Sequence, residues 1–464
     1  MSFRKNIESA VLEFIRDRRM LLPGMKTLLA VSGGVDSAVM FRIFLSLQDE
    51  LGIELGVAHF DHSLRGGESD RDREFVRKLA ENHNLPVHIG IGSVKDIPGG
   101  EGIQQKARTA RFNFFEQLLD EEGYDKLALA HHRDDQAEST LMAILRGYGF
   151  RGIAGIRPVS GRYIHPLLCL SRKQIEEYAE ASQQPFVLDS SNLKMDYLRN
   201  RVRHSLLPAV REIFPGAEES LADFSADTAE IDDYLQYQAD RILKSAVKFN
   251  SGRIILEIKD FLQYFSILQK YALLSLFRIL TADFRPSPQQ LDQILKLADS
   301  STGAVMQVGP VTVSKDRGCL FFCSDIPEEM DVVLETGSEI VVSDWLLKSE
   351  LIDREQVKFT AQPDVEFLDR EKIKGPLRVT NWRRGDRFQP LGMHGETKVS
   401  DFLVNMKIPR LEKPRLPVLR DDEKIVWLCG LRLDDRVKVT PDTADVLKLS
   451  CRAVSKLPDT GGPS

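Results

Sequence analysis

Short apolar runs alternate with amphipathic stretches along the first two hundred residues. Runs of strand length occur at 27–31, 53–60, 87–91 and 126–130. Apolar residues recur at helical spacing over 38–47, 72–82, 103–121 and 134–146. Strands that alternate with helices are joined by right-handed crossovers, so they form a parallel sheet with helices on both faces. We therefore predict an α/β domain for residues 1–215.

Polar segments follow three of the predicted strands. They read SGGVDS (32–37), DHSLRGGESD (61–70) and HHRDDQAE (131–138). In an open parallel sheet, ligands bind beyond the carboxyl ends of the strands. The sequence therefore places three loops around one candidate site.

The pattern changes twice beyond this domain. Residues 215–240 contain no Lys or Arg and eight acidic residues at helical amphipathic spacing, which is typical of a solvated helix face. Helical spacing continues at 265–280 and 288–297, and short strands with turns follow from about residue 330. We predict a mainly helical middle domain (216–330) and a small mixed α+β C-terminal domain (331–464).

Composition excludes several classes of protein. The 464 residues are 42% hydrophobic and 28% charged, unlike a disordered or collagen-like chain. No apolar run approaches the roughly 18 residues of a membrane helix, and Glu8 and Glu13 interrupt any signal-peptide core. The five cysteines are scattered without a CxxC pair, which favours a reducing cytosol and a cytoplasmic location. The net charge of −6 argues mildly against nucleic-acid binding, yet 383–420 is locally basic.

The SGGVDS segment is the sharpest chemical signal. Gly33 and Gly34 let the backbone approach a phosphate, and the following helix N-terminus offers N–H groups. Ser32 and Ser37 add hydroxyl groups, whereas Asp36 suits a phosphate site only with a cation such as Mg²⁺. The alternative is a glycine-rich turn with a capped helix. No GxxxxGK[ST] occurs, so a Walker-type kinase or GTPase loop is excluded.

This segment resembles the PP-loop of N-type ATP pyrophosphatases, which cleave ATP between the α and β phosphates. Longer segments resemble the tRNA(Ile)-lysidine synthase family, at 58–76, 131–147, 165–179, 189–208 and 383–419. The resemblance spans nearly the whole chain and implies a Rossmann-like PP-loop domain. One departure is Val399, where the family often has a second lysine after Lys398.

The resemblance implies a reaction. Members of the family adenylate the C2 carbonyl oxygen of the wobble cytidine of the isoleucine tRNA with a CAU anticodon, and pyrophosphate leaves. Free L-lysine then replaces AMP, so the tRNA reads AUA and is charged with isoleucine instead of methionine. The implied cofactors are ATP and Mg²⁺. The implied partners are tRNA(Ile) and L-lysine, and a homodimer is compatible with the sequence.

Candidate catalytic residues follow from this chemistry. Lysine has a reference pKa of about 10.4, so on the order of one molecule in a thousand is neutral at pH 7, and a base or burial is needed. Asp135 and Glu138 share a helix face and form the predicted lysine site, although an acid at this position also caps a helix. The resemblance implies that Arg111 faces the reacting phosphate or base, a task that suits a guanidinium; the alternative is a surface arginine. The predicted ATP site is Ser32, Gly33, Gly34, Val35, Asp36, Ser37 and His59, with Asp36 as the Mg²⁺ ligand.

Two groups of cations are candidate tRNA contacts, because arginines beside planar groups suit phosphates and bases. The first contains Tyr197, Arg199, Asn200, Arg201 and Arg203; the second contains Arg383, Arg384, Arg387, Lys398, Arg410, Lys413 and Arg415. An interdomain salt-bridge set and a solvated charged face are the respective alternatives. Two other functions remain open: a tRNA thiolase, which needs cysteines near the active site, and a non-catalytic nucleotide-dependent RNA-binding module.

Overall fold

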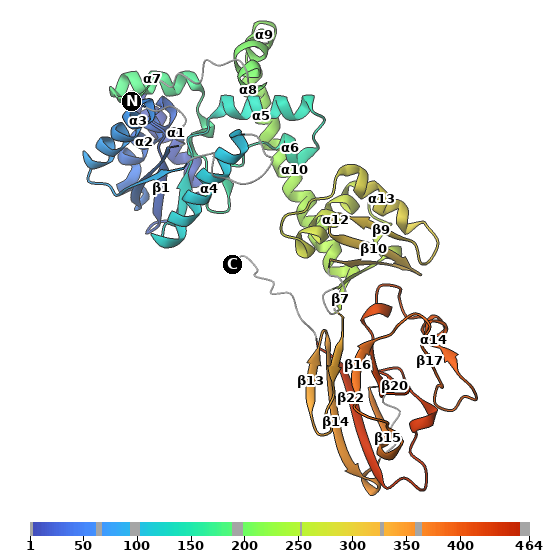
Figure 1. Ribbon diagram of the computed structural model, residues 1–464. Coiled ribbons are helices and arrows are strands. Elements are labelled where there is room, and N and C mark those ends of the chain that lie inside the picture. The colour runs from blue at the N-terminus through green and yellow to red at the C-terminus, as the bar shows by residue number, and fades with distance from the viewer. Residues whose placement is uncertain are drawn as a thin grey trace. The chain divides into compact units, whose positions relative to one another are not determined.

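The computed structural model describes residues 3–61, 67–92, 103–187, 198–250, 253–324, 329–357 and 364–454. The chain divides into two compact units, Met1–Tyr234 and Leu235–Ser464. Figure 1 labels the elements of both units along the colour gradient from blue to red. Each unit has its own apolar cores.

A six-stranded sheet forms the centre of the first unit, in the spatial order β3, β2, β1, β4, β6, β5. Its strands are β1 (Lys26–Ala30), β2 (Glu54–Asp61), β3 (Val87–Ile91), β4 (Lys126–Ala128), β5 (Val159–Ser160) and β6 (Tyr163–Ile164). All neighbours pair in parallel except β5 with β6. The chain runs outward from β1 to β3 and returns to β4 on the other side of β1. A strand order that reverses beside β1 leaves a crevice there, which is where open α/β sheets bind ligands.

Different helices cover the two faces of this sheet (Figure 1). Leu29 and Val57 belong to a core with α1 (Phe3–Asp17), α2 (Val35–Leu51), α3 (Gly67–Glu81) and α7 (Arg172–Ser182). Leu28 and Ala58, their neighbours on the same strands, belong to a second core with α4 (Ile103–Glu121). Successive strand residues point to opposite faces, so the continuous apolar runs reflect burial on both sides. The predicted α/β layout of this region is therefore confirmed.

The first unit extends beyond the predicted boundary at residue 215. The 30-residue helix α10 (Ala217–Ala246) begins in this unit and continues into the second. The Ser225 hydroxyl donates to the carbonyl of Ile153 at 2.9 Å, and Asp232 pairs with Arg157 at 2.6 Å. Asp232 is buried, so at least one acidic residue of this helix does not belong to a solvated face.

The middle segment of the second unit contains more strand than the sequence pattern predicts. Helices α11 (Ile258–Phe261), α12 (Ser266–Leu280) and α13 (Pro288–Ala298) share an apolar core with an antiparallel sheet. The sheet has the order β7, β8, β11, β10, β9. Its strands are β7 (Val247–Asn250), β8 (Arg253–Glu257), β9 (Val305–Val308), β10 (Val311–Asp316) and β11 (Cys319–Cys323). Strands of four to six residues carry too few alternations for the periodicity to be recognised.

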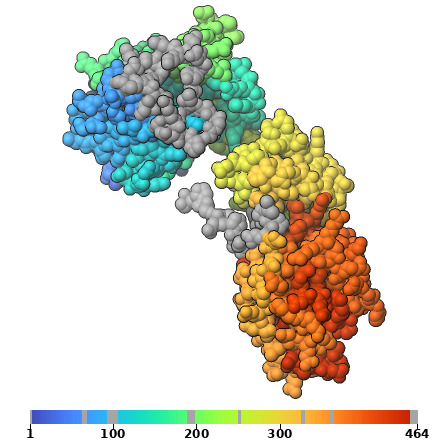
Figure 2. Space-filling view, viewed as in Figure 1, coloured from blue at the N-terminus to red at the C-terminus, as the bar shows by residue number. Residues whose placement is uncertain are grey.

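The C-terminal segment is built from antiparallel sheets. One sheet has the order β12, β16, β19, β20, β21, and the other has the order β13, β14, β22, β15. The strands of the first are β12 (Asp331–Val333), β16 (Arg378–Asn381), β19 (Pro417–Arg420), β20 (Ile425–Leu428) and β21 (Arg432–Leu433). Those of the second are β13 (Glu339–Val342), β14 (Trp345–Asp353), β15 (Val365–Asp369) and β22 (Asp445–Ala453). A hairpin of β17 (Arg387–Phe388) and β18 (Thr397–Lys398) leads into α14 (Val399–Asn405). Figure 2 colours the middle segment yellow and this segment orange to red.

A buried charge cluster joins the middle and C-terminal segments of the second unit. Its members are Arg253, Cys323, Asp344, Glu412 and Arg415, from both segments. The Asp344 carboxylate lies 3.6 Å from the Arg253 guanidinium and 3.7 Å from that of Arg415. Arg253 also lies 3.6 Å from Glu412, and Arg415 donates to the Cys323 sulfur at 3.0 Å. Both arginines are at most 6% exposed, so removing one acid would leave an uncompensated buried charge.

Candidate active site

The glycine-containing loop between β1 and α2 is held by its two serines. The Ser32 amide donates to the Ser37 hydroxyl at 3.1 Å, and that hydroxyl donates to the Gly34 carbonyl at 2.9 Å. Gly33 has φ +97°, a conformation that residues with a Cβ rarely adopt. Gly34 is the N-cap of α2, so Val35 and Asp36 lie in the first helical turn. The loop therefore presents a helix N-terminus, which attracts anions, to the crevice beside β1.

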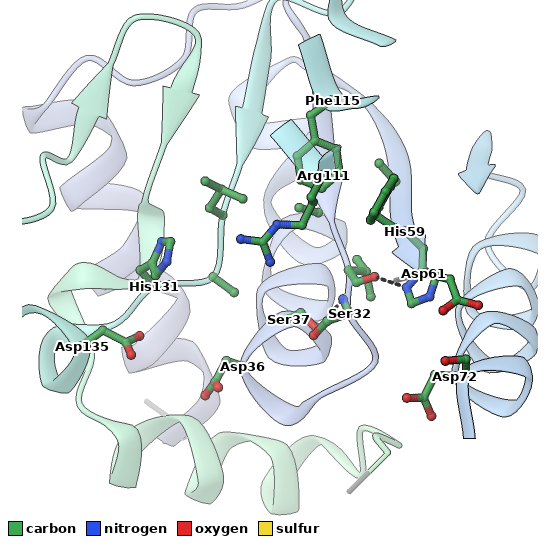
Figure 3. A pocket seen from close by; sticks show the side chains of 17 residues that line it. Ser32, Asp36, Ser37, His59, Asp61, Asp72, Arg111, Phe115, His131 and Asp135 are labelled. Atoms are coloured by element: carbon green, nitrogen blue, oxygen red, sulfur yellow. Dashed lines mark hydrogen bonds between the residues drawn. The ribbon is translucent and has the colours of Figure 1, made fainter. Parts of the chain in front are cut away.

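A cavity of about 500 Å³ opens at this loop, at the carboxyl ends of β1, β2 and β4. Its lining includes Ser32, Asp36 and Ser37 from the loop and α2, and Arg111 and Asp135 from α4 and α5 (Arg133–Leu145). Figure 3 shows these side chains converging on one space. The volume lies in the roughly 300–1,000 Å³ range of small-molecule sites. The predicted convergence of the loops after β1 and β4 is confirmed; residues 62–66 of the loop after β2 lie outside the described residues.

Arg111 reaches into the cavity from α4 (Figure 3). Its Nε is buried and has no hydrogen-bond partner among the described residues. Burial, followed by the nearby Arg108, lowers the pKa of this guanidinium. The residue is half-buried, and its guanidinium carbon lies 5.5 Å from the centroid of the Phe112 ring. A cation in the cavity wall whose Nε has no hydrogen bond favours an anionic ligand at this point.

His59 lies on β2 at the opposite wall of the cavity (Figure 3). Its Nδ1–H donates to the Val31 carbonyl at 2.8 Å, which links the ends of β1 and β2. Burial lowers the pKa of this imidazole, although the bond to Val31 opposes the shift. The ring is therefore neutral and fixed beside the loop.

The acid pair of α5 is already occupied by arginines. Glu138, whose side chain is 1% exposed, accepts from the Arg199 Nε at 2.8 Å and also contacts Arg203. Asp135 accepts from Arg203 at 2.7 Å and from Arg199 at 3.2 Å. Burial alone would raise the pKa of Asp135, but His132 and Arg199 lower it overall. The two acids share one helix face and bind two guanidinium groups there.

Arg199 and Arg203 therefore differ from their predicted role as outward tRNA contacts. They lie in α8 (Leu198–Arg201) and in the π-helical turn Val202–Leu206, which bring both side chains onto α5. Arg201 is exposed and Asn200 is half-buried. Tyr197 lies outside the described residues.

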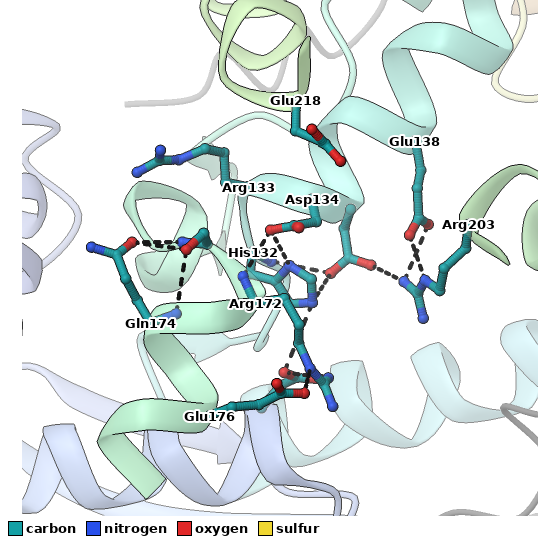
Figure 4. A network of polar contacts seen from close by, with 12 residues as sticks. His132, Arg133, Asp134, Glu138, Arg172, Gln174, Glu176, Arg203 and Glu218 are labelled. Atoms are coloured by element: carbon teal, nitrogen blue, oxygen red, sulfur yellow. Dashed lines mark hydrogen bonds and ion pairs between the residues drawn. The ribbon is translucent and has the colours of Figure 1, made fainter. Parts of the chain in front are cut away.

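Asp36 belongs to a second polar network, in which Figure 4 labels its partners His132 and Arg172. Its carboxylate accepts from Arg172 at 2.7 and 2.8 Å, and it lies 3.8 Å from His132. Burial raises the pKa of Asp36, whereas His132 and Arg172 oppose the rise. For His132, burial would lower the pKa, but Asp134 and Asp135 outweigh burial and raise it. His132 is 3% exposed and lies among three carboxylates, so it balances charge beneath the cavity.

No group of three or more His, Cys, Asp or Glu side chains in the described part of the chain forms a ready metal site. Asp36 is one of four carboxylates in the cavity wall, together with Asp61, Asp72 and Asp135. Mg²⁺ in nucleotide sites is commonly held by one or two carboxylates together with the phosphates. The residues present therefore fit a magnesium ion that arrives with a nucleotide.

His131 is a cavity residue that sequence reasoning did not assign. Its ring lies 4.9 Å from that of His165 and its Nδ1 is buried without a partner among the described residues. Burial, followed by repulsion from His165, lowers the pKa of His131 to about 3. Arg172 was also missed, because its partner Asp36 lies 136 positions away and only the fold brings them together. The sole local signal for Arg172 was its place in the resembling segment 165–179.

Most of the distal cations are exposed. Arg383, Arg384, Arg387, Lys398 and Arg410 are exposed, and Lys413 is half-buried. Arg387 and Lys398 face each other across β17 and β18. Like charges placed directly opposite destabilise a strand pair, and the Glu396 carboxylate, 3.3 Å from the Arg387 guanidinium, offsets part of this repulsion.

Two distal positions differ from the sequence expectation. Arg415 is 4% exposed and belongs to the buried charge cluster, so it is withdrawn from the predicted tRNA contacts. Val399 is fully buried with Phe388 and Leu403 in an apolar core. The departure from the family's second lysine therefore fills a core position here.

The cysteines do not form a sulfur-transfer site. Cys169 is the only cysteine in the first unit, and its thiol lies 3.5 Å from the Pro166 carbonyl. Burial raises the pKa of Cys169 to about 12. A thiol that stays protonated is a poor nucleophile, which counts against the thiolase alternative.

Comparison with known proteins assigns both ends of the chain. Residues 3–210 match the PP-loop domain family, and residues 377–451 match the TilS substrate C-terminal domain family. A tRNA(Ile)-lysidine synthase of Geobacter sulfurreducens is 32% identical over 454 residues, 93% of this chain and 95% of the relative. One of Bacteroides thetaiotaomicron is 31% identical over 449 residues, 95% of this chain and 99% of the relative.

Solved structures resemble separate parts of the chain. A TILS C-terminal domain covers 28% of this chain and 99% of its own, with 25% identity and a TM-score of 0.26. The U34-tRNA thiolase NcsA from Methanococcus maripaludis covers 49% of this chain and 79% of its own, with 20% identity and a TM-score of 0.42. Among the described residues, no helix is both long and apolar enough to span a membrane.

Proposed function

The chain belongs to the tRNA(Ile)-lysidine synthase family and forms lysidine on tRNA(Ile) with ATP, and we propose that its cavity at β1, β2 and β4 is where this chemistry occurs. One observation carries the assignment: the phosphate-binding loop, Arg111 with its unpartnered Nε, and Asp135 line the same space, and Glu138 shares the two arginine partners of Asp135. These three elements match an anionic nucleotide, a reacting centre and a cationic amine.

The loop is proposed to hold the phosphates of ATP. Its amides and the N-terminus of α2 face the crevice, and the Ser32 and Ser37 hydroxyls stand beside them. His59 lies on the opposite wall and would contact the rest of the nucleotide. Asp36 would hold Mg²⁺, which neutralises charge on the departing pyrophosphate. Arg172 already binds Asp36, so it orients the carboxylate in the absence of the ion.

Arg111 is proposed to stabilise charge at the reacting centre. The wobble cytidine would receive AMP on its C2 oxygen, with pyrophosphate as the leaving group. A guanidinium that has no other partner at Nε can bind the developing charge without first breaking a bond. His131 stays neutral beside it and cannot add a competing positive charge.

Asp135 and Glu138 are proposed to bind the ammonium group of L-lysine. Both accept from two guanidinium groups, which have the charge that the lysine side chain carries. Lysine must displace at least part of this contact and lose a proton before its amine can attack C2. The acids would hold the cation and receive that proton.

The distal cations are proposed to contact the tRNA backbone. The pair Arg387 and Lys398 is exposed on one hairpin, and Arg383, Arg384 and Arg410 lie exposed in the same segment. Phosphate contacts of this kind supply much of the affinity for nucleic acid.

The test is a reaction of the full chain with labelled L-lysine, ATP–Mg²⁺ and tRNA(Ile) carrying the CAU anticodon. Digestion to nucleosides should place the label in lysidine, with AMP and pyrophosphate released in equal amounts. Omission of either lysine or tRNA should abolish lysidine. ADP as the main nucleotide product, or sulfur in the modified base, would contradict the assignment.

A further inference from the structure

A second pocket lies in the C-terminal segment, apart from the candidate active site. Its volume is about 530 Å³, and its described lining consists of Glu329, Met330, Asn381, Trp382, Arg383, Arg384 and Pro414. This lining combines a large aromatic ring, two cations and one carboxylate. A pocket of that size and composition suits a nucleotide.

The aromatic ring of this pocket is fixed in place. Trp382 directly follows β16, and its indole N–H donates to the Lys413 carbonyl at 2.8 Å. The ring packs against the apolar core of the hairpin and α14, and it also lines the pocket. The Asn381 side chain connects the Met330 amide at 2.6 Å and the Pro414 carbonyl at 2.9 Å, which closes the pocket wall. A ring ordered in advance loses little entropy when a base stacks on it.

The guanidinium groups of the two pocket arginines are available to bind an anion. Both Arg383 and Arg384 are exposed, and neither guanidinium has a hydrogen bond or ion pair with any described residue. Their backbone is nonetheless held, since the Arg383 amide donates to Asp386 at 2.7 Å and Asp386 accepts from Arg420 at 2.9 Å. The turn thus holds two free cations beside the indole.

Glu329 restricts which base would fit. Its carboxylate is exposed in the pocket and has no described cationic partner. A carboxylate accepts from the amino groups of cytosine and adenine but repels the carbonyl edge of uracil. The pocket therefore favours a base that carries an amino group, stacked on Trp382, with its phosphates at Arg383 and Arg384.

We propose that this pocket binds an unpaired nucleotide at the 3′ end of the tRNA, an inference that rests on the proposed function. Stacking on an aromatic side chain requires a base that is not already paired and stacked in a helix. The anticodon base is used at the candidate active site. Apart from its loops, the single-stranded part of a tRNA is its 3′ terminus, where a discriminator base is followed by two cytosines and an adenine. That chemistry agrees with the preference set by Glu329.

The experiment compares two forms of the same tRNA(Ile). One is intact, and the other lacks its last four nucleotides. Affinity for the full-length protein is measured by fluorescence anisotropy at one fixed salt concentration. Base–aromatic stacking is worth about 1–3 kcal/mol, so the wild-type protein should bind the trimmed tRNA roughly 5- to 100-fold more weakly.

Three variants locate the effect. Trp382→Ala should bind both tRNAs equally, whereas Trp382→Phe should keep most of the preference. If Trp382→Ala fails to fold, the double variant Arg383→Ala with Arg384→Ala removes the phosphate contacts without touching the core. Arg432→Ala, which removes an exposed arginine from the far edge strand β21 of the same sheet, is the matched control and should behave as wild type.

The affinity measurement tests the pocket assignment, and the lysidine assay tests the proposed function. Equal affinity of the wild-type protein for the two tRNAs, or a preference that survives in both the tryptophan and the arginine variants, would overturn the pocket assignment. Lysidine formation on the intact tRNA is measured in parallel. Its absence would contradict the proposed function, whereas its presence with equal affinities would contradict only the pocket.

Discussion

Substitution of Glu138 by Gln should separate the two half-reactions. The side chain is 1% exposed and keeps its shape in the variant, so the main change is the loss of one negative charge. The cluster of Asp135, Glu138, Arg199 and Arg203 is neutral in the wild type and would carry a charge of +1 in the variant. That excess repels the lysine ammonium.

The size of the effect follows from one charge-assisted contact. A hydrogen bond to a charged group contributes about 1.5–3 kcal/mol net. At about 1.4 kcal/mol for each factor of ten, the lysine KM should rise roughly 10- to 150-fold. Formation of the adenylated tRNA should change little, because the loop and Arg111 are untouched.

The assay measures the steps separately. Adenylated tRNA is trapped with α-labelled ATP in the absence of lysine, and lysidine is then followed over a lysine titration. Glu180→Gln loses the same charge from an exposed position on α7 and is the control. A thermal unfolding curve establishes that the variant is folded, since Glu138 also holds two arginines.

Two results would refute the reasoning. A folded variant with an unchanged lysine KM would show that Glu138 does not bind the amine. A folded variant that no longer forms adenylated tRNA would show that the acid serves the first step as well.

Three further predictions concern other parts of the chain. Asp36→Asn should give the opposite pattern, with adenylated tRNA reduced at least tenfold at limiting Mg²⁺ and binding of lysine retained; wild-type adenylation would exclude a metal role. For His131, the folded pKa of about 3 lies below the unfolded value of about 6.5, so the unfolded chain takes up the proton first and stability falls as pH drops below about 6.5. Urea unfolding of the first unit should therefore lose up to about 2 kcal/mol more between pH 7 and pH 5 in the wild type than in His131→Gln, and equal losses would refute the buried neutral ring. Replacing Arg387 and Lys398 together by Ala should lower the slope of log affinity for tRNA against log salt by about two, and an unchanged slope would leave this hairpin without a role in phosphate binding.

The sequence was most informative for apolar runs of strand length. The strand predictions 27–31 and 87–91 agree with β1 and β3 to within one residue, although β1 lies in the sheet interior and β3 is a mostly half-buried edge strand. The helix after SGGVDS begins earlier than expected, at Val35, because Gly34 is its N-cap. Strands of two residues, such as β5 and β6, have no periodicity to detect.

The candidate site was less predictable because charge pairing depends on the fold. The basic segment 383–420 contains no local pattern that shows which arginine is buried. Arg415 is buried because the fold brings Asp344 and Cys323 beside it. Arg199 and Arg203 were recognised as cations of functional interest, yet their acidic partners lie more than sixty positions away. The acid pair itself was found because a spacing of three is a local helix property.

The buried charge cluster also bears on how the chain folds during synthesis. Arg253 leaves the ribosome about 90 residues before Asp344 and about 160 before Glu412 and Arg415. At roughly 5–20 residues per second, the middle sheet waits on the order of ten seconds for the acids that neutralise its arginine. In a nascent chain, the Arg253 guanidinium at the start of β8 therefore stays in contact with water until the C-terminal segment is synthesised. An expression fragment that stops before Asp344 would leave Arg253 without either acid.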